Sequence, residues 1–385
     1  MIRSQTLALF VDEYRSLRAR RLFWIVLGLS LVFVAALACV ANNEEGIEVL
    51  FWTLPIEFLS TKVFPRREFM QLMFLTLGFQ LWLTWVATIL ALISTASILP
   101  DFISGGAIEL TLSKPMGRLR LYLTKYATGL LFVALQVVVF AAGSFLVIGL
   151  RGGGWDFRLW LAIPLVVIFF SYLFCFCSLV GLLTRSTIAS LILTILLWVV
   201  IFLVHLSETG IILQFRVQKD LVVATLATDI EARKIEANNL RTPPEDEPPD
   251  ATTARLARLA KLEDAITFRE AELEADRKSA RTLNRVHAIL FAVKTVLPKT
   301  SETMELMGRW MLDPDKLAAL QDSSTTTSPP IQSSRGSIRV SQRTVAREMQ
   351  AEVASRSVWW VVGTSLAFEV VLVGAGAIVF CRRDF

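Results

Sequence analysis

One acidic residue, Glu369, lies in the middle of an apolar run, between Phe368 and Val370. A carboxylate at the centre of a membrane-crossing helix costs about 2.5–3.5 kcal/mol on insertion scales unless it is protonated or faces polar groups. Two interpretations follow. The carboxyl could contact a substrate or a proton on an internal surface, or it could be a packing group hydrogen-bonded to Thr, Ser or Tyr of a neighbouring helix. Glu369 is therefore a candidate intramembrane polar site.

The usual catalytic and metal-binding patterns are absent from the sequence. Its two histidines, His205 and His287, belong to no HExxH pattern, and there is no GxSxG motif for a serine nucleophile. Cys175 and Cys177 are two residues apart, so on a helix they point to different faces and form no metal pair. The phosphate-binding pattern GxxxxGK[ST] is also missing, and no lysine follows the glycines of 149–158. We therefore expect no catalytic, cofactor-binding or metal-binding residue in this chain.

The composition is that of a membrane protein. Of the 385 residues, 54% are hydrophobic and 19% are charged, and the mean hydropathy is +0.56. Soluble proteins have about 45–50% apolar and about 25% charged residues. The net charge of +5 comes from basic residues beside the apolar runs rather than from one patch. The chain is thus expected to contact the lipid bilayer and not nucleic acid.

Six apolar runs approach or exceed the roughly 20 residues needed to cross a bilayer. They cover residues 22–40, 72–98, 127–150, 159–183, 187–205 and 357–380. The first run is too long for the apolar part of a signal peptide and has no clear cleavage pattern after it, so it is expected to be a retained span. The predicted fold class is an all-α polytopic membrane protein with six transmembrane helices, in the inner or cytoplasmic membrane of a cell.

Basic residues of the short flanks predict the orientation of these spans. If the N-terminus is cytoplasmic, the inside flanks hold Arg3, Arg15, Arg18, Arg20, Arg21, Lys114, Arg118, Arg120, Lys125, Arg185, Arg382 and Arg383. The short outside loops then hold only Lys62, Arg66, Arg67, Arg151 and Arg158. Both termini are therefore expected inside the cell.

An amphipathic helix is predicted over residues 3–20, before the first span. Leu7, Phe10, Tyr14 and Leu17 recur at helical spacing and arginines occupy the other faces, which is typical of a helix lying in the membrane interface. A basic tail without fixed structure is the alternative.

Residues 1–205 would form the transmembrane domain, and residues 357–385 the sixth span and cytoplasmic C-terminus.

The long segment 206–356 is expected outside the cell. Residues 215–240 and 252–290 are rich in helix-forming residues, and the prolines of the intervening TPPEDEPPD cannot continue a helix. Leucines of the second arm follow a heptad, but Arg269 and Asp276 fall on its seam. A helical hairpin is predicted, with a solvated, partly disordered arm as the alternative. A low-complexity linker (323–337) and a helix (340–356) would complete the segment.

A cytoplasmic segment, 101–125, connects the second and third spans. Ala107 to Ser113 is expected to form a short helix that ends at Lys114-Pro115, because a residue before proline disfavours helical dihedrals. An ordinary basic loop is the alternative.

Residues 101–126, DFISGGAIELTLSKPMGRLRLYLTKY, resemble the cytoplasmic segment of ABC transporter permeases of the ABC-2 class. Members of that family commonly carry a Gly-Thr/Ala-Ile-Glu-Leu run, then Leu-Ser-Lys-Pro, then an Arg and a Lys-Tyr/Phe. The matching residues are Gly106, Ala107, Ile108, Glu109, Leu110, Leu112, Ser113, Lys114, Pro115, Arg118 and Lys125. The basic entry helix, the closing FCRRDF (380–385) and the six-span plan also resemble the family, over residues 1–205 and 340–385. Ile103 and Ser104 replace a charged residue common in the family, and 206–356 is longer than the usual outer loop.

The resemblance implies the membrane-spanning permease subunit of an ABC exporter, paired with a second permease subunit of the same or another kind. A separate ABC ATPase subunit would bind ATP and dock on the cytoplasmic helix, so that this chain holds no cofactor. The implied ATPase-coupling residues are Gly106, Ile108, Glu109, Leu112, Lys114, Pro115 and Arg118. The alternative, prompted by the size of 206–356, is a non-transporting membrane anchor or scaffold whose hairpin binds a cell-envelope partner through 215–290.

Overall fold

The computed structural model describes residues 15, 21–49, 52–54, 61, 65–104, 117–242, 248–312, 331–334, 336 and 339–383. These residues fall into two compact units. The first, here called the membrane unit, comprises Met1–Phe202, Thr295–Ser324 and Ser357–Phe385. The second, here called the hairpin unit, comprises Leu203–Lys294 and Thr325–Arg356. The amphipathic helix predicted over 3–20 lies outside the described residues except for Arg15, which is helical.

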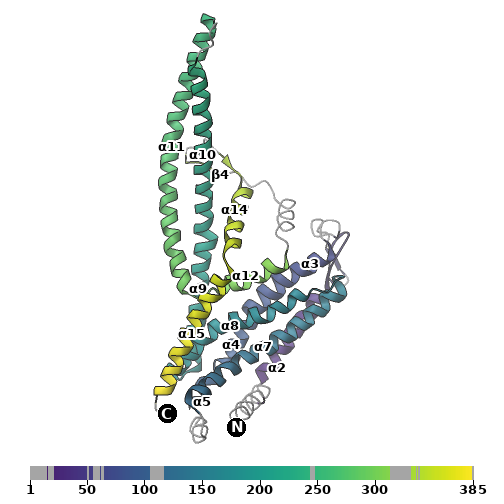
Figure 1. Cartoon of the computed structure of the whole chain (residues 1–385). Coiled ribbons are helices and arrows are strands. Elements are labelled where there is room, and N and C mark those ends of the chain that lie inside the picture. Colours follow the sequence, from purple (N-terminus) through teal and green to yellow (C-terminus); the bar gives the residue numbers. More distant parts are fainter. Residues whose placement is uncertain are drawn as a thin grey trace. The chain divides into compact units, whose positions relative to one another are not determined.

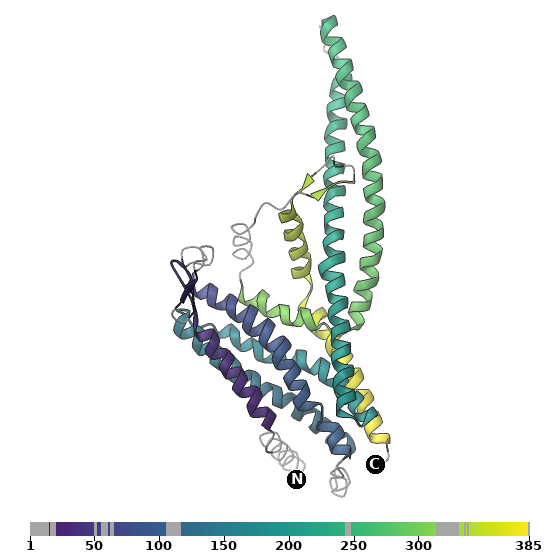
Figure 2. The same cartoon turned by 180° about the vertical axis from the view of Figure 1, so that it is seen from behind.

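Six helical stretches of the described chain are long and apolar enough to cross a membrane, as the sequence predicts. They are Arg21–Ala38, Arg66–Ile103, Arg118–Arg151, Phe157–Thr184, Thr187–Arg241 and Val358–Arg382. The start of the first stretch and the end of the last lie at the same end of the membrane unit (Figures 1 and 2). The chain is therefore a multi-pass, helical membrane protein.

The helices that lie wholly or mainly in the membrane unit subdivide these stretches, except α12, which belongs to none of them. They are α2 (Arg21–Ala38), α3 (Arg66–Met73), the π-helix η2 (Phe74–Ala87), α4 (Thr88–Thr95), α5 (Ile98–Ser104), α7 (Arg118–Arg151), the 3-10 helix η3 (Phe157–Leu161), α8 (Ala162–Thr184), α9 (Thr187–His205), α12 (Thr300–Met311) and α15 (Val358–Arg382). Of the cytoplasmic segment predicted over 101–125, residues 101–104 belong to α5 and residues 118–125 belong to α7, whereas residues 105–116 lie outside the described residues. Hydropathy predicted the apolar part of each span, but it did not predict that the helices continue into the polar residues beyond the apolar runs.

A small antiparallel sheet follows α2 and was not predicted. It contains β1 (Val40–Asn43), β2 (Gly46–Val49) and β3 (Trp52–Leu54) in that order. Asn43 pairs with Gly46 across a two-residue turn, and Gly46 adopts a φ of 148° that favours glycine. Strands of three or four residues are too short to give a clear alternating pattern.

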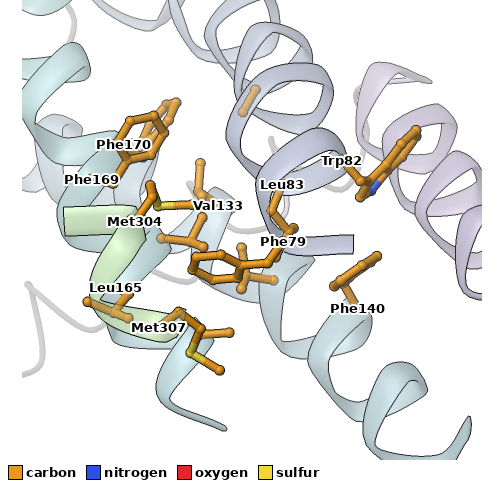
Figure 3. Close-up of a cluster of buried hydrophobic side chains, with 14 of the residues drawn as sticks. Phe79, Trp82, Leu83, Val133, Phe140, Leu165, Phe169, Phe170, Met304 and Met307 are labelled. Atoms are coloured by element: carbon orange, nitrogen blue, oxygen red, sulfur yellow. The ribbon is translucent and has the colours of Figure 1, made fainter. Parts of the chain in front are cut away.

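The core of the membrane unit is built around α8, which packs against α7, α12 and α15. Figure 3 shows Phe169 and Phe170 of α8 facing Met304 of α12, with Phe79 of η2 and Val133 of α7 in the same cluster. All five side chains are buried. Within a bilayer, such side chains stabilise helix association through close van der Waals packing.

Helix α12 lies within the segment predicted over 206–356, and it packs in the core of the membrane unit. The reason is the apolar face of α12, on which Met304, Met307 and Met311 are buried in the core. At 12 residues the helix is too short to be recognised as a span. The extracytoplasmic location of 206–356 stays a prediction.

The hairpin unit contains the two long helices that the sequence predicts, together with shorter elements. They are η4 (Leu206–Ile212), α10 (Leu213–Arg241), α11 (Pro249–Val296), β4 (Ile331–Gln332), β5 (Arg339–Val340) and α14 (Gln342–Ser355). Helices α10 and α11 lie side by side and antiparallel, and α14 packs on α10 (Figures 1 and 2). Apolar side chains from both arms form their own core: Val222, Leu226, Ile230, Leu262, Ile266 and Leu273.

Charge pairs bridge the two arms at the two polar positions that interrupt the predicted heptad. Asp276, which interrupts the heptad, accepts a hydrogen bond from Lys219 at 2.9 Å and is buried. Arg269, the other interruption, pairs with Asp229 of α10. These pairs explain how a polar seam can stay closed, since a buried charge needs a partner.

We predict that Gly129→Val destabilises the membrane unit, whereas Gly28→Val does not. A Cβ atom at Gly129 would overlap the buried ring of Phe174, but one at Gly28 would meet no atom within 4 Å. Overpacking of this kind costs about 1–3 kcal/mol. Both variants place the same β-branched residue in a membrane helix, so thermal unfolding of the purified proteins in detergent isolates the clash. Equal midpoints for the two variants would contradict the tight contact between α7 and α8.

Candidate functional site

The carboxyl of Glu369 lies between α15, α7 and α8 in the membrane unit. The hydroxyl of Tyr126 on α7 donates a hydrogen bond to Glu369 Oε1 at 2.8 Å. The hydroxyl of Ser171 on α8 donates to Oε2 at 2.7 Å. Tyr and Ser are among the residue types predicted to hydrogen-bond this carboxyl if Glu369 is a packing group. The same geometry also presents an ionisable group, half-buried, inside the bundle.

Aromatic packing fixes the position of Tyr126. Its ring stacks on Phe174 of α8, with centroids 5.3 Å apart and planes 16° apart, and Phe174 in turn stacks on Phe170. Gly129, one turn after Tyr126, leaves the space that the Phe174 ring occupies. The phenol is therefore held in one place relative to α8, so its hydroxyl can point at Glu369 without a large loss of side-chain entropy.

A second cluster, here called the end cluster, lies where α5 ends and α7 begins. It joins α5, α7, α8 and α15 through Leu99, Phe102, Ile103, Leu121, Tyr122, Leu182, Ala377 and Phe380. The Lys125 ammonium lies 4.5 Å from the centre of the Phe102 ring. Segments α5 and α7 flank residues 105–116, so both flanks of that stretch are anchored in one apolar cluster.

Arg118, one of the residues expected to couple to an ATPase, is bound to the end of α15. Its guanidinium donates to the main-chain carbonyls of Cys381 at 3.2 Å and Arg383 at 3.0 Å. Arg383 in turn donates to the carbonyl of Leu182, close to the end of α8, at 2.5 Å. The last carbonyls of a helix have no partner within it, and basic side chains there bind them and favour the helix dipole. Both arginines therefore act as caps that join helix ends.

The other expected coupling residues lie outside the described residues. These are Gly106, Ile108, Glu109, Leu112, Lys114 and Pro115. The structure thus brings together the flanks of the expected coupling segment, including Arg118, and places Glu369 in a separate cluster with Tyr126 and Ser171. Within the described residues, no group of three or more His, Cys, Asp or Glu side chains is arranged to hold a metal ion.

Comparisons with protein-family models, curated proteins and solved structures find no match to this chain. The functional interpretation of both clusters therefore rests on the sequence and the geometry.

Sequence reasoning missed a buried ionic cluster at the base of the hairpin unit. Glu208 is fully buried, and Arg356 binds it through both carboxylate oxygens at 2.6 and 3.3 Å. Lys294 donates to Glu208 Oε2 at 2.5 Å, and His287 Nε2 lies 3.0 Å from Oε1. Thr209 completes the shell with a hydroxyl 2.7 Å from Oε2. The only sequence signal was the i, i+7 spacing of His287 and Lys294, which puts them on one face of α11.

The surroundings of Glu208 favour its ionised form. The residue follows the apolar run 187–205 and belongs to the hairpin unit. Burial alone would raise the pKa of its carboxyl, but the hydrogen bond from Arg356 and the charge of Lys294 outweigh burial and lower the pKa to about 2. A carboxyl with a lowered pKa stabilises the fold above its ordinary value of 4.5, and that stabilisation is lost as the pH falls towards 2.

We predict that Glu208→Gln lowers the stability of the hairpin unit by about 3–5 kcal/mol, because it removes the carboxylate that two buried cations bind. The side chains of Lys294 and Arg356 are only 4% and 7% exposed. The matched control is Glu236→Gln, which breaks a pair with Arg258 whose side chains are 43% and 67% exposed. That change should cost less than about 1 kcal/mol. Hydrogen exchange of α10 and α11 in the whole protein measures both effects, and similar exchange in the two variants would refute the assignment.

Proposed function

We propose that this chain is the membrane-spanning permease subunit of an ABC exporter, with both termini in the cytoplasm. The observation that carries the proposal is the likeness of residues 101–126 to the ATPase-docking segment of ABC-2 permeases. The structure adds support, because the helices that flank residues 105–116 are fastened to α8 and α15 through the end cluster. A segment whose two flanking helices are fixed in this way is suited to transmit a displacement imposed by a docked ATPase.

Close packing would transmit such a displacement to the other helices of the membrane unit. Pro100 of α5 packs so tightly on α8 that a Cβ atom at Gly181 would lie 3.1 Å from its ring. From the other flank, α7 runs without interruption from Arg118 to Arg151. Packed interiors deform little, so a displacement of one helix is passed to its neighbours. The ATPase would act on 105–116, and α5 and α7 would carry the movement into the bilayer.

In this proposal the chain performs no chemistry of its own. ATP is bound and hydrolysed on the partner ATPase, and the transport pathway forms with a second permease subunit. Consistent with this division, the phosphate-binding pattern that an ATPase requires is absent from the sequence. Export as the direction of transport comes from the resemblance.

We predict that Ile108→Asp and Glu109→Lys each weaken binding of the ATPase by at least about tenfold without lowering the amount of protein in the membrane. Ile108→Asp removes an apolar contact of about 1.5–3 kcal/mol, and Glu109→Lys introduces an unfavourable charge that can cost several kcal/mol. Co-purification in mild detergent, with ATPase activity and transport assays, measures the effect.

The matched control is Glu45→Lys, the same charge reversal at an exposed turn between β1 and β2. It should leave ATPase binding unchanged. Full ATPase association in both segment variants would show that 101–125 is only a basic loop. Repeated recovery of the unaltered chain without any ATPase would count against the permease proposal as a whole.

The hairpin unit favours a second candidate, a membrane scaffold that binds a cell-envelope partner without transport. It forms a compact unit with its own apolar core, and so could serve as a binding module. Replacing residues 221–274 by a short Gly/Ser loop separates the two candidates, since it keeps the Lys219–Asp276 pair and the Glu208 cluster at the base. We predict that this shortened protein still binds and stimulates the ATPase; loss of all measurable function would favour the scaffold.

A further inference from the structure

Glu369 is an acidic group whose partners in the bundle are neutral. Tyr126 and Ser171 supply hydroxyl donors to its two oxygens, and no Lys or Arg of the described residues forms an ion pair with it. The other titratable groups facing it, Tyr172 and Cys175 of α8, are weak acids that carry no positive charge.

Among the described residues, no charged side chain of the remaining neighbours forms a hydrogen bond or ion pair with Glu369. On α7, the Lys125 ammonium beside Tyr126 lies 4.5 Å from the centre of the Phe102 ring. On α12, which also packs on α15, the charged side chains are Glu302, Glu305 and Arg309, and no hydrogen bond or ion pair joins any of them to Glu369. Lys299, just before α12, places its ammonium 4.6 Å from the centre of the Trp360 ring. The other charged residue of α15 is Arg382, at its end. An anion at Glu369 would therefore rely on two hydroxyl groups alone, in a setting where an uncompensated charge is costly.

The two hydroxyl groups each have a second acceptor. The oxygen of Tyr126 lies 3.1 Å from the main-chain carbonyl of Ser171 as well as 2.8 Å from Glu369. The hydroxyl of Ser171 lies 2.8 Å from the carbonyl of Ile168 as well as 2.7 Å from Glu369. A hydroxyl group has one proton and so donates to one acceptor at a time. Each hydroxyl can therefore turn towards the carboxyl or away from it.

Because each hydroxyl has two acceptors, Glu369, Tyr126 and Ser171 can all be hydrogen-bonded whether Glu369 is protonated or ionised. When Glu369 is an anion, both hydroxyls donate to it. When Glu369 holds a proton, its own O–H can donate to the Tyr126 oxygen, and Tyr126 donates to the Ser171 carbonyl. Ser171 then donates either to the second carboxyl oxygen or to the Ile168 carbonyl. Only hydrogen atoms need to move, so neither state leaves a buried polar group unsatisfied.

We propose that Glu369 is a reversible proton-binding site in the membrane-embedded part of this protein, with Tyr126 and Ser171 as its positioning residues. The ligand is the proton itself, taken up by the carboxylate as a covalent O–H bond and released again without any other reactant. The site is distinct from the proposed ATPase-docking segment, and its proton binding can be measured without an ATPase or a substrate. Failure of one proposal therefore leaves the other standing.

The test uses the whole protein in lipid nanodiscs and a hydrophobic carbodiimide, which reacts with protonated carboxyl groups. Glu369 adjoins the exposed apolar residues Val370 and Val371, so a lipid-soluble reagent can approach it. Mass spectrometry should find Glu369 labelled, with labelling that decreases as the pH is raised, because only the protonated carboxyl reacts. Glu369→Gln should lose this label completely, whereas Glu44→Gln, at an exposed turn, should keep it.

Tyr126→Phe separates a proton site from a merely structural carboxyl. The variant keeps the stacked ring but removes one donor to the anion, so half-maximal labelling should shift to higher pH. Infrared difference spectra provide a second readout that needs no reagent: the unaltered protein should show a pH-dependent carboxylic-acid C=O band that is absent in Glu369→Gln. Labelling and band both independent of pH, or both absent throughout the range, would overturn the proposal.

Discussion

The burial of one helix, α8, organises the membrane unit. Apolar residues cover almost all its faces, and α7, α12 and α15 each bury part of their own surface against it. Between helices in a bilayer, close packing and hydrogen bonds replace much of the driving force that water supplies to soluble proteins. The tight fit of Gly129 against Phe174 and of Gly181 against Pro100 shows how this association is achieved: one helix supplies a bulky ring and its neighbour supplies a residue without a side chain.

Three buried threonine hydroxyls of this unit form hydrogen bonds within their own helices. The hydroxyls of Thr95, Thr128 and Thr194 each donate to a carbonyl four residues earlier in their own helix. Glu369 differs, because its partners come from two other helices and so tie three helices together. The same carboxyl that is costly to bury therefore also specifies how α7, α8 and α15 are aligned. In the hairpin unit Glu208 has an equivalent role, but it joins its segments through opposite charges.

Features that depend on local composition could be predicted from the sequence, and features that depend on distant contacts could not. Six spans and two hairpin arms follow from hydropathy and helix propensity along the chain. The membership of α12 in the membrane unit depends on Met304 and Met307 meeting α8, which no local pattern reveals. For Glu369, the sequence limited the partners to Ser, Thr or Tyr; choosing Tyr126 and Ser171 required the helix packing. The Glu208 cluster was missed because its members are scattered over 149 positions, from 208 to 356.

The charge pairs along α10 and α11 become less exposed from the tip of the hairpin towards its base. Arg241–Glu263 and Lys234–Glu270 are largely in solvent, Lys219–Asp276 is partly buried, and Lys294–Glu208 is almost fully buried. Exposed pairs contribute little to stability, so the loss of one partner of a charge pair costs most at the base. During evolution, equal stretches could be gained or lost from both arms at the tip while the base stays intact. A change of length at the tip would therefore leave the buried charges of the base in place.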